Sequence, residues 1–209
     1  MKENYIIAGF RKTAEQHFPE QKSALNAKLN KRLEELRIEN SEATEEKQFH
    51  LERQILPGIA AYEILQTVVP KEEAFRMVHG YVEDHAKSAR KKIMKLIHIP
   101  WLYRLIPNIF AKGMRKMFNE RAGFAATEYQ TSGGVWRIDM TRCPYHDTCV
   151  QYGCPELCRC FCDSDDITYD DMHPKLLWHR TKTLGRGDDC CDFSIKVVKQ
   201  RIKQKKFRK

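Results

Sequence analysis

The apolar residues of the first part of the chain recur at every third or fourth position, with lysine, arginine and glutamate between them. This spacing is that of one buried face of an amphipathic helix, and it predicts a helix over residues 4–37. Acidic residues after Ser41 are typical of the first turn of a second helix, which we expect to reach about Val69 with a kink or interruption at Pro57. A third helix is predicted to begin at Pro70. The leucines that define the first stripe are Leu25, Leu29, Leu33 and Leu36.

Residues 91–118 combine an apolar helical face with basic residues, and two prolines make the element short and broken. A stripe of this kind is usually buried in a core or covers a pocket, but beside lysine and arginine it also suits an anionic membrane surface. Both interpretations stay open, so weak membrane-surface contact is retained among the expected interactions. The apolar positions are Phe110, Met114, Met117 and Phe118, and the basic positions are Lys112, Arg115 and Lys116.

From Gly123 the spacing of apolar residues changes to every second position. Alternation on both sides of a Gly-Gly pair predicts a β-hairpin whose second strand has one buried face. Short helices are expected to begin at Pro144 and Pro155, and strands are expected over residues 176–184 and 191–198. The predicted fold class is therefore α+β, with an N-terminal helical layer that covers one face of a ββ-α-ββ antiparallel sheet.

Three regions are expected along the chain: a helical region over residues 1–120, a cysteine-rich α+β region over 121–198 that carries the site, and a basic tail over 199–209. The length of 209 residues is enough for one large domain or two small ones. The net charge of +9 depends on the end of the chain, because residues 196–209 hold eight lysines or arginines and no acid. We interpret the tail as a solvated element and expect no specific nucleic-acid partner, since no nucleic-acid-binding motif is present.

All eight cysteines lie between residues 143 and 191. No apolar run approaches the roughly 20 residues of a membrane span, and none follows the initiator methionine, so we expect no transmembrane segment and a cytoplasmic location. Thiols stay reduced there, and their clustering indicates metal binding or catalysis rather than a disulfide framework. The sequence does not indicate an oligomeric state.

Four of the cysteines are predicted to meet in one pocket. Cys143 follows the second strand, Cys191 opens the fourth, and Cys158 and Cys162 share one face of the intervening helix. A helix that joins two strands of one sheet packs over that sheet, which would bring these thiols together. Such a group suits a divalent metal such as zinc. Alternatively, one thiolate near the start of a helix is a nucleophile, or the thiols only pack in the core.

The cysteine-rich segment also resembles a known family. The features that carry the resemblance are Cys143, the Cys-Pro-Glu-Leu-Cys run at 154–158, Cys162 with its following acids, the Arg-Thr-Lys-Thr-Leu run at 180–184, and Cys191-Asp192-Phe193. Together they resemble the L-2-amino-thiazoline-4-carboxylic acid hydrolase family. The resemblance implies an enzyme that opens a five-membered thiazoline ring by water addition and yields an N-carbamoyl-cysteine. The additional cysteines to which it gives no role are Cys149, Cys160 and Cys190.

The expected function is hydrolysis of a small cyclic C–N substrate, similar to 2-amino-thiazoline-4-carboxylate, at a cysteine-rich site. Asp165 is the candidate general base, His146 is a candidate acid, base or ligand, and Arg180 is the candidate group that binds the carboxylate of a small-molecule substrate. Each also has a structural alternative as a helix-end acid, a structural histidine or one half of a surface ion pair. A second function class stays open, namely a cysteine-rich metal- or ligand-binding module without turnover.

Overall fold

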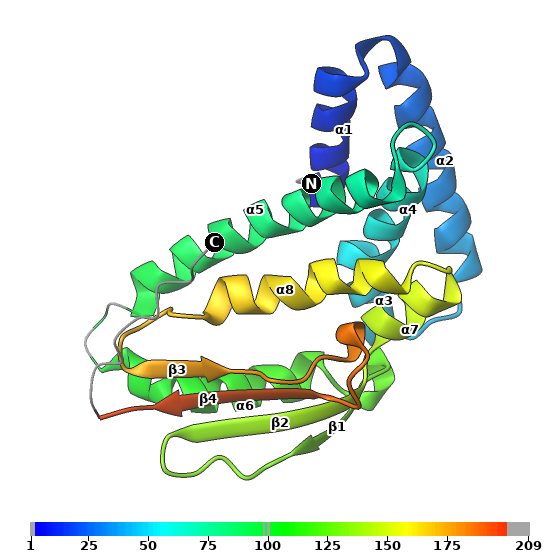
Figure 1. Ribbon diagram of the computed structural model, residues 1–209. Coiled ribbons are helices and arrows are strands. Elements are labelled where there is room, and N and C mark those ends of the chain that lie inside the picture. Colours follow the sequence, from blue (N-terminus) through cyan, green and yellow to red (C-terminus); the bar gives the residue numbers. More distant parts are fainter. Residues whose placement is uncertain (1–2, 98, 100, 200–209) are drawn as a thin grey trace. The chain divides into compact units, whose positions relative to one another are not determined.

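The computed structural model of the protein describes residues 3–97, 99 and 101–199 (Figure 1). Helices dominate these ranges, and one antiparallel sheet of four strands accompanies them, so the α+β class predicted from the sequence is confirmed. No helix within the described ranges is both long enough and apolar enough to span a membrane. The predicted basic tail lies outside the described residues, except for Lys199.

Contacts divide the chain into two compact units that interleave along the sequence. The first unit contains the residues up to His85 together with 144–163, and the second contains 86–143 together with the residues from Ser164 on. Two helices, α5 (Lys71–Ile97) and α8 (Cys158–Tyr169), begin in the first unit and end in the second. The regional boundaries expected at residues 120 and 198 follow composition rather than contacts, and they stay a prediction.

The first unit is helical. It contains four α-helices of the N-terminal segment and the short helices that follow the hairpin, together with the first parts of α5 and α8. Helix α5 begins directly after Pro70, as the sequence predicted. The elements are α1 (Tyr5–His17), η1 (Pro19–Gln21), α2 (Lys22–Glu39), α3 (Glu45–His50), η2 (Leu51–Ile55), α4 (Leu56–Leu65), α5 (Lys71–Ile97), α7 (Pro144–Gln151), η5 (Pro155–Leu157) and α8 (Cys158–Tyr169).

The single helix predicted over residues 4–37 was wrong, because the structure has two helices there, α1 and α2. Phe18 leaves the helical conformation with φ −135°, and Pro19 starts the 3-10 turn η1. Proline has no N–H to donate and its ring clashes with the preceding turn, which accounts for the break. The predicted buried face is confirmed, since all four leucines of α2 are buried.

The interruption expected at Pro57 is present, but it lies just before the proline. Residues of η2 form a π-helical turn between α3 and α4, and Pro57 occupies the first turn of α4. Pro57 cannot donate a hydrogen bond to the carbonyl of Arg53. The side-chain amide of Asn4 donates to that carbonyl instead, at 2.8 Å, and the Asn4 side-chain oxygen accepts from the N–H of Ile6 at 2.9 Å. The Asn4 side chain therefore caps the N-terminus of α1 and also supplies the hydrogen bond that Pro57 cannot donate to the Arg53 carbonyl.

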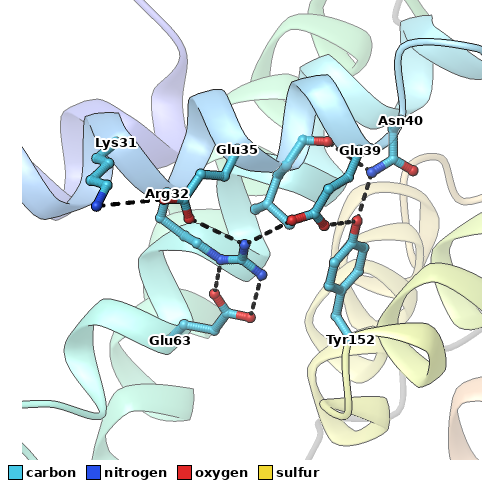
Figure 2. A network of polar contacts seen from close by, with 8 residues as sticks. Lys31, Arg32, Glu35, Glu39, Asn40, Glu63 and Tyr152 are labelled. Carbon is cyan, nitrogen blue, oxygen red and sulfur yellow. Dashed lines mark hydrogen bonds and ion pairs between the residues drawn. The ribbon is translucent and has the colours of Figure 1, made fainter.

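A polar network on the first unit ties α2 to α4 and to the residue that follows α7 (Figure 2). Arg32 Nε donates to Glu63 Oε2 at 2.6 Å, and Arg32 Nη1 donates to Glu39 Oε1 at 3.3 Å. The Tyr152 hydroxyl donates to Glu39 Oε2 at 2.7 Å and accepts from Asn40 Nδ2 at 2.8 Å. The network joins segments more than a hundred residues apart in the sequence.

Four of the thiols belong to the apolar core of the first unit rather than to its surface. Close packing brings α4 and α8 together there, since a Cβ added at Gly58 would lie 2.7 Å from Phe161 Cζ. Free cysteine behaves as a small apolar residue in such a core. The buried cysteines of this unit are Cys149, Cys154, Cys158 and Cys160.

The second unit is built on the sheet, whose strand order is β1-β2-β4-β3 with every neighbouring pair antiparallel. The hairpin predicted around the Gly-Gly pair joins β1 to β2, and Gly133 and Gly134 have φ of 57° and 76°. The elements are η3 (Leu102–Leu105), α6 (Ile106–Met117), η4 (Glu120–Ala122), β1 (Ala125–Glu128), β2 (Val135–Arg142), β3 (Leu176–His179), η6 (Leu184–Arg186) and β4 (Cys191–Val197).

One face of the sheet is buried, as the alternation in β2 predicted. Phe110 of α6 contacts the rings of Trp136 and Trp178, with centroids 5.5 and 6.4 Å apart, and Tyr169 of α8 contacts Trp178 at 5.1 Å. Helix α6 and the end of α8 therefore cover this face. Its buried strand residues are Trp136, Ile138, Met140, Leu176, Trp178, Cys191, Phe193 and Ile195.

The strand predicted over residues 176–184 was too long. β3 ends at His179, and the next residues leave the ladder as a loop. Asp192 of β4 explains the departure, because its carboxylate accepts from the backbone N–H groups of Thr181 and Lys182 at 2.7 and 2.6 Å. A side-chain acceptor thus replaces the ladder partners that a longer β3 would have used.

Candidate functional site

A charged cluster lies at the edge of the buried sheet face in the second unit. Asp165 and Asp166 come from the second half of α8, and Arg180 follows the last residue of β3. Side chains alternate across a strand, so Arg180 lies on the same face as Trp178. The sequence placed Asp165 and Arg180 at one site, and the structure brings both into the second unit.

Arg180 is held by an ion pair and by an aromatic ring. Its side chain is only 3% exposed, and Arg180 Nη2 donates to Asp166 Oδ2 in a short ion pair. The guanidinium lies 5.3 Å from the centroid of the Phe193 ring. The other carboxylate oxygen of Asp166 accepts from Trp178 Nε1 at 2.9 Å. A buried charge is tolerated when it is paired and hydrogen-bonded in this way.

The carboxyl of Asp165, the residue before Asp166, has a raised pKa. Burial raises the pKa of the Asp165 carboxyl to about 7; the Arg180 guanidinium opposes this rise and the Asp166 carboxylate adds to it. The adjacent Tyr169 also has a raised pKa, about 12, because of burial and the charge of Asp165. A carboxyl whose pKa is raised by burial beside a charged partner is a common feature of acid–base sites.

The loop after Arg180 supplies a backbone donor to Cys191. Cys191 Sγ accepts from the N–H of Leu184 at 3.2 Å, and Asp188 accepts from the N–H of Thr183 at 2.7 Å. Asp192, next to Cys191, binds the loop as described above; burial acts to raise its pKa, but hydrogen bonds from Thr181 and Lys182 outweigh this and lower it. The loop is thus fixed around the start of β4.

The four cysteines predicted to meet fall into two pairs. Cys158 and Cys162 share a face of α8 in the first unit, with sulfurs 3.8 Å apart. Cys143 and Cys191 belong to the second unit, where β2 pairs Met140 with Cys191, so Cys143 lies just past the same end of the sheet. Both pairs confirm the local geometry that the sequence implied. The meeting of all four thiols in one pocket stays a prediction.

No metal-binding group is apparent among the described residues. In the ranges that the structure covers, no three histidine, cysteine, aspartate or glutamate side chains are arranged to hold a metal ion. The eight cysteines, all of them within those ranges, form no disulfide bond. Burial raises the pKa of Cys160, with the charge of Asp163 adding to it, so this thiol stays protonated and does not supply a thiolate.

His146 lies in α7 of the first unit and has a local partner. Its Nδ1 is 3.7 Å from Asp147 Oδ1, and both side chains are partly exposed. This contact is compatible with the structural alternative stated for His146. A catalytic or ligand role for it stays a prediction.

Sequence reasoning missed the part that Asp166 plays at the charged cluster. The signal was present, because Asp165 and Asp166 are adjacent and only one of them was given a role. On a helix, adjacent residues point about 100° apart, so one carboxyl can bind Arg180 and Trp178 while its neighbour occupies different surroundings. The roles of the two acids could be separated only once β3 and α8 were placed together.

Comparisons with known proteins give structural likenesses and a family. A trafficking protein particle complex subunit 3 from Naegleria fowleri, solved covalently bound to palmitic acid, is 11% identical, with 72% of this chain and 98% of that chain covered and a TM-score of 0.36. A comparison with curated proteins gave no match. A sequence profile matches residues 48–195, a range that includes Asp165, Arg180 and all eight cysteines. Because this match spans more than half of the chain, the protein belongs to the L-2-amino-thiazoline-4-carboxylic acid hydrolase family.

Proposed function

We propose that the protein hydrolyses a small cyclic amidine that carries a carboxylate, with 2-amino-thiazoline-4-carboxylate as the first substrate to test. Membership of the family supports the reaction class. The observation that supports a site is the Asp165 carboxyl, whose pKa burial raises to about 7 beside the Arg180–Asp166 ion pair. A carboxyl of this acidity gains and loses a proton near neutral pH, as general acid–base catalysis requires.

In the proposed reaction, Asp165 in its ionised form removes a proton from a water molecule that attacks C2 of the thiazoline ring. The water oxygen stays on C2 and becomes the carbonyl oxygen of the carbamoyl group. The C2–S bond breaks, and the sulfur leaves as the thiol of the product. One proton of the water goes to the ring nitrogen and the other to the sulfur, with Asp165 returning the proton that it took. No oxidant or reductant is needed.

Arg180 is proposed to bind the substrate carboxylate through its positive charge. Its planar guanidinium suits a carboxylate. Asp166 and Phe193 fix the orientation of that guanidinium. Positioning of this kind lowers the barrier because the reacting atoms are held near one another before the chemical step.

The thiols are proposed to act either as metal ligands or as a nucleophile, with Cys143, Cys158, Cys162 and Cys191 as the candidate residues. Elemental analysis of the purified protein, combined with a count of reactive thiols, separates these two roles. If a metal such as zinc is bound, a serine at any of the four positions lowers metal content and turnover together. If one thiol is a nucleophile, its serine variant stays folded, keeps its metal content and loses turnover alone.

The proposed function is tested by incubating the protein with 2-amino-thiazoline-4-carboxylate and following the product by mass spectrometry as the gain of one water. We expect Asp165→Asn to lower kcat by roughly 10²–10⁴-fold, because the amide cannot accept the proton. The kcat of the wild type should rise with pH through about 7, where Asp165 ionises.

Asp163→Asn is the matched control. Asp163 lies on the same helix, two residues earlier, and pairs with His79 at 3.2 Å. Its variant should keep wild-type turnover. Turnover by Asp165→Asn equal to that of the wild type would remove Asp165 from the mechanism, and absence of turnover in the wild type would reject this substrate.

A further inference from the structure

Exposed apolar side chains are concentrated in one short part of the second unit. Eleven large apolar side chains of the described residues are exposed, and six of them lie between residues 96 and 117. A concentration of this kind marks an interaction surface more often than scattered exposure does. The six residues are Leu96, Ile99, Trp101, Leu105, Ile109 and Met117.

Several of these side chains share the outward face of α6. Leu105, Ile109, Lys112 and Lys116 follow one another at intervals of four, three and four residues, which places them on one face of a helix. The opposite face is occupied by the sheet, since Phe110 contacts the aromatic rings of the buried face. We call Trp101, Leu105, Ile109, Lys112 and Lys116 the α6 surface.

The charge around the α6 surface is strongly positive. Residues 87–120 carry nine lysines or arginines and one acid, Glu120. A surface groove of ≈ 630 Å³ opens beside α6. Arg115, Lys112 and Lys116 in this groove are all exposed, and Arg115 pairs with Glu128 at 2.7 Å. The polar residues that line the groove are Asn108, Lys112, Arg115, Lys116, Gln130 and Thr131.

Trp101 is presented to solvent by an unusual backbone. It is 60% exposed and has φ 67°, in the left-handed region that bulky residues seldom occupy. The segment is held in place nearby, because Tyr103 of η3 stacks on His173 with centroids 4.6 Å apart. Strained conformations of this kind persist where the surrounding structure enforces them, and they cluster at functional positions.

We propose that the α6 surface binds the interface of an anionic lipid bilayer. Trp101, Leu105 and Ile109 enter the boundary between headgroups and acyl chains, and the basic groove beside them receives lipid phosphates. Indole rings favour this boundary, and basic residues near it attract anionic lipids. A nucleic acid accounts less well for the surface, because half-exposed leucine and isoleucine side chains have little to gain from phosphates. This proposal is independent of the proposed hydrolase activity.

The test uses the full-length protein and sedimentation with two kinds of vesicle: phosphatidylcholine alone, and an equal mixture of phosphatidylcholine and phosphatidylserine. We expect binding to the mixed vesicles and little binding to the neutral ones. Lys112→Glu/Lys116→Glu should weaken binding by an order of magnitude or more, since each basic residue contributes on the order of fivefold. Ile109→Asn should weaken it roughly fivefold through lost apolar burial.

Tryptophan fluorescence gives a second readout. Trp136 and Trp178 are 1% and 8% exposed, so a change on mixing with vesicles reports mainly on Trp101. Its emission should shift to the blue with the mixed vesicles, and Trp101→Phe should abolish the shift. A shift that persists in Trp101→Phe would contradict insertion at this position.

Matched controls lie on the first unit. Lys12→Glu/Lys28→Glu changes the net charge by the same amount on exposed positions of α1 and α2, and Ile38→Asn removes an apolar side chain that is 66% exposed. Both controls should bind as the wild type does. Equal vesicle binding by Lys112→Glu/Lys116→Glu and the wild type would overturn the proposal. Binding to duplex DNA or RNA without binding to vesicles would also overturn it and assign the groove to nucleic acid.

Discussion

At residue scale, the charged cluster on α8 places two chemically identical side chains, Asp165 and Asp166, in different surroundings. Asp166 binds Arg180 and the indole N–H of Trp178, whereas burial raises the pKa of Asp165 to about 7. An ionised Asp165 is therefore unfavourable in the folded protein. Residues that carry such a cost are retained in catalytic sites because the shifted acidity is useful there.

This cost predicts how stability depends on pH. The pKa of Asp165 is higher in the folded protein than in the unfolded chain, so the wild type loses stability as the pH rises from about 4 to about 7. Asp165→Asn cannot ionise and escapes this loss. We expect it to be more stable than the wild type by about 4 kcal/mol at pH 8, and equal to it below pH 4. Urea unfolding across this range measures the difference.

Asp189→Asn provides the control for that experiment. Asp189 is exposed, and its pKa is lowered by the hydrogen bond and charge of Lys182. Its replacement should not stabilise the protein at any pH, since a lowered pKa means that the ionised form is favoured in the folded state. Parallel pH profiles for Asp165→Asn and the wild type would show that Asp165 titrates normally.

At the scale of elements, apolar spacing predicted most helices and strands, and the errors occurred at Pro19 and where a side chain competes with the backbone ladder. The spacing found α5, the hairpin and the four strands. It did not show that Asp192 ends β3 by binding the N–H groups of residues 181 and 182, because that contact joins positions ten or eleven residues apart. It also did not show that Asn4 repairs the helix before Pro57 from about fifty residues away.

The contact made by Asp192 gives a prediction for the loop. Asp192→Ala removes the acceptor for the backbone N–H groups of two exposed residues, Thr181 and Lys182, and we expect a loss of about 1 kcal/mol in stability at pH 7. Because the pKa of Asp192 is lowered in the folded state, the wild type should lose this advantage as the pH falls below about 4. Hydrogen exchange at Thr181 and Lys182 should become faster in the variant.

Ser194→Ala is the matched control on the same strand, since its hydroxyl makes only a long contact of 3.5 Å to the carbonyl of His179. Its stability and its exchange rates should stay within error of the wild type. If Asp192→Ala also leaves exchange at the loop unchanged, the loop is held by other contacts.

The network of Figure 2 predicts a difference between two adjacent basic residues. Arg32 is 23% exposed and binds Glu63 at 2.6 Å, whereas Lys31 is 81% exposed and lies 3.8 Å from Glu35. We expect Arg32→Met to lower the free energy of unfolding by about 1.5 kcal/mol, and Lys31→Met to change it by less than about 0.5 kcal/mol. Urea unfolding of both variants checks this, and equal losses would contradict it.

At the scale of the whole molecule, the α+β class followed from the sequence, but the division into units did not. Composition changes near residue 120, whereas contacts place residues 144–163 with the N-terminal helices. The first unit is completed by thiols and aromatic rings of α7, η5 and α8 that look like site residues in the sequence. Cys158, for example, was predicted as a site residue and is buried in its core. Spacing alone cannot distinguish a buried thiol from a reactive one.

The basic tail gives a prediction at the same scale. Residues 200–209 carry six lysines or arginines and no acid, so their deletion lowers the net charge from +9 to +3. We expect the isoelectric point to fall and the melting temperature to stay unchanged, because the segment lacks an apolar stripe long enough to pack. A large fall in melting temperature would show that the tail contributes to the fold.

The interleaving of the two units has a consequence for biosynthesis. The core of the first unit needs Cys158, Cys160 and Phe161, which leave the ribosome only after residues 86–143 have been made. At ordinary translation rates, the chain from residue 86 to residue 163 takes roughly 4–16 s to synthesise. During that interval the apolar faces of α1, α2 and α4 lack part of their final partners. The nascent N-terminal helices are therefore expected to be the segment of this protein that molecular chaperones bind first.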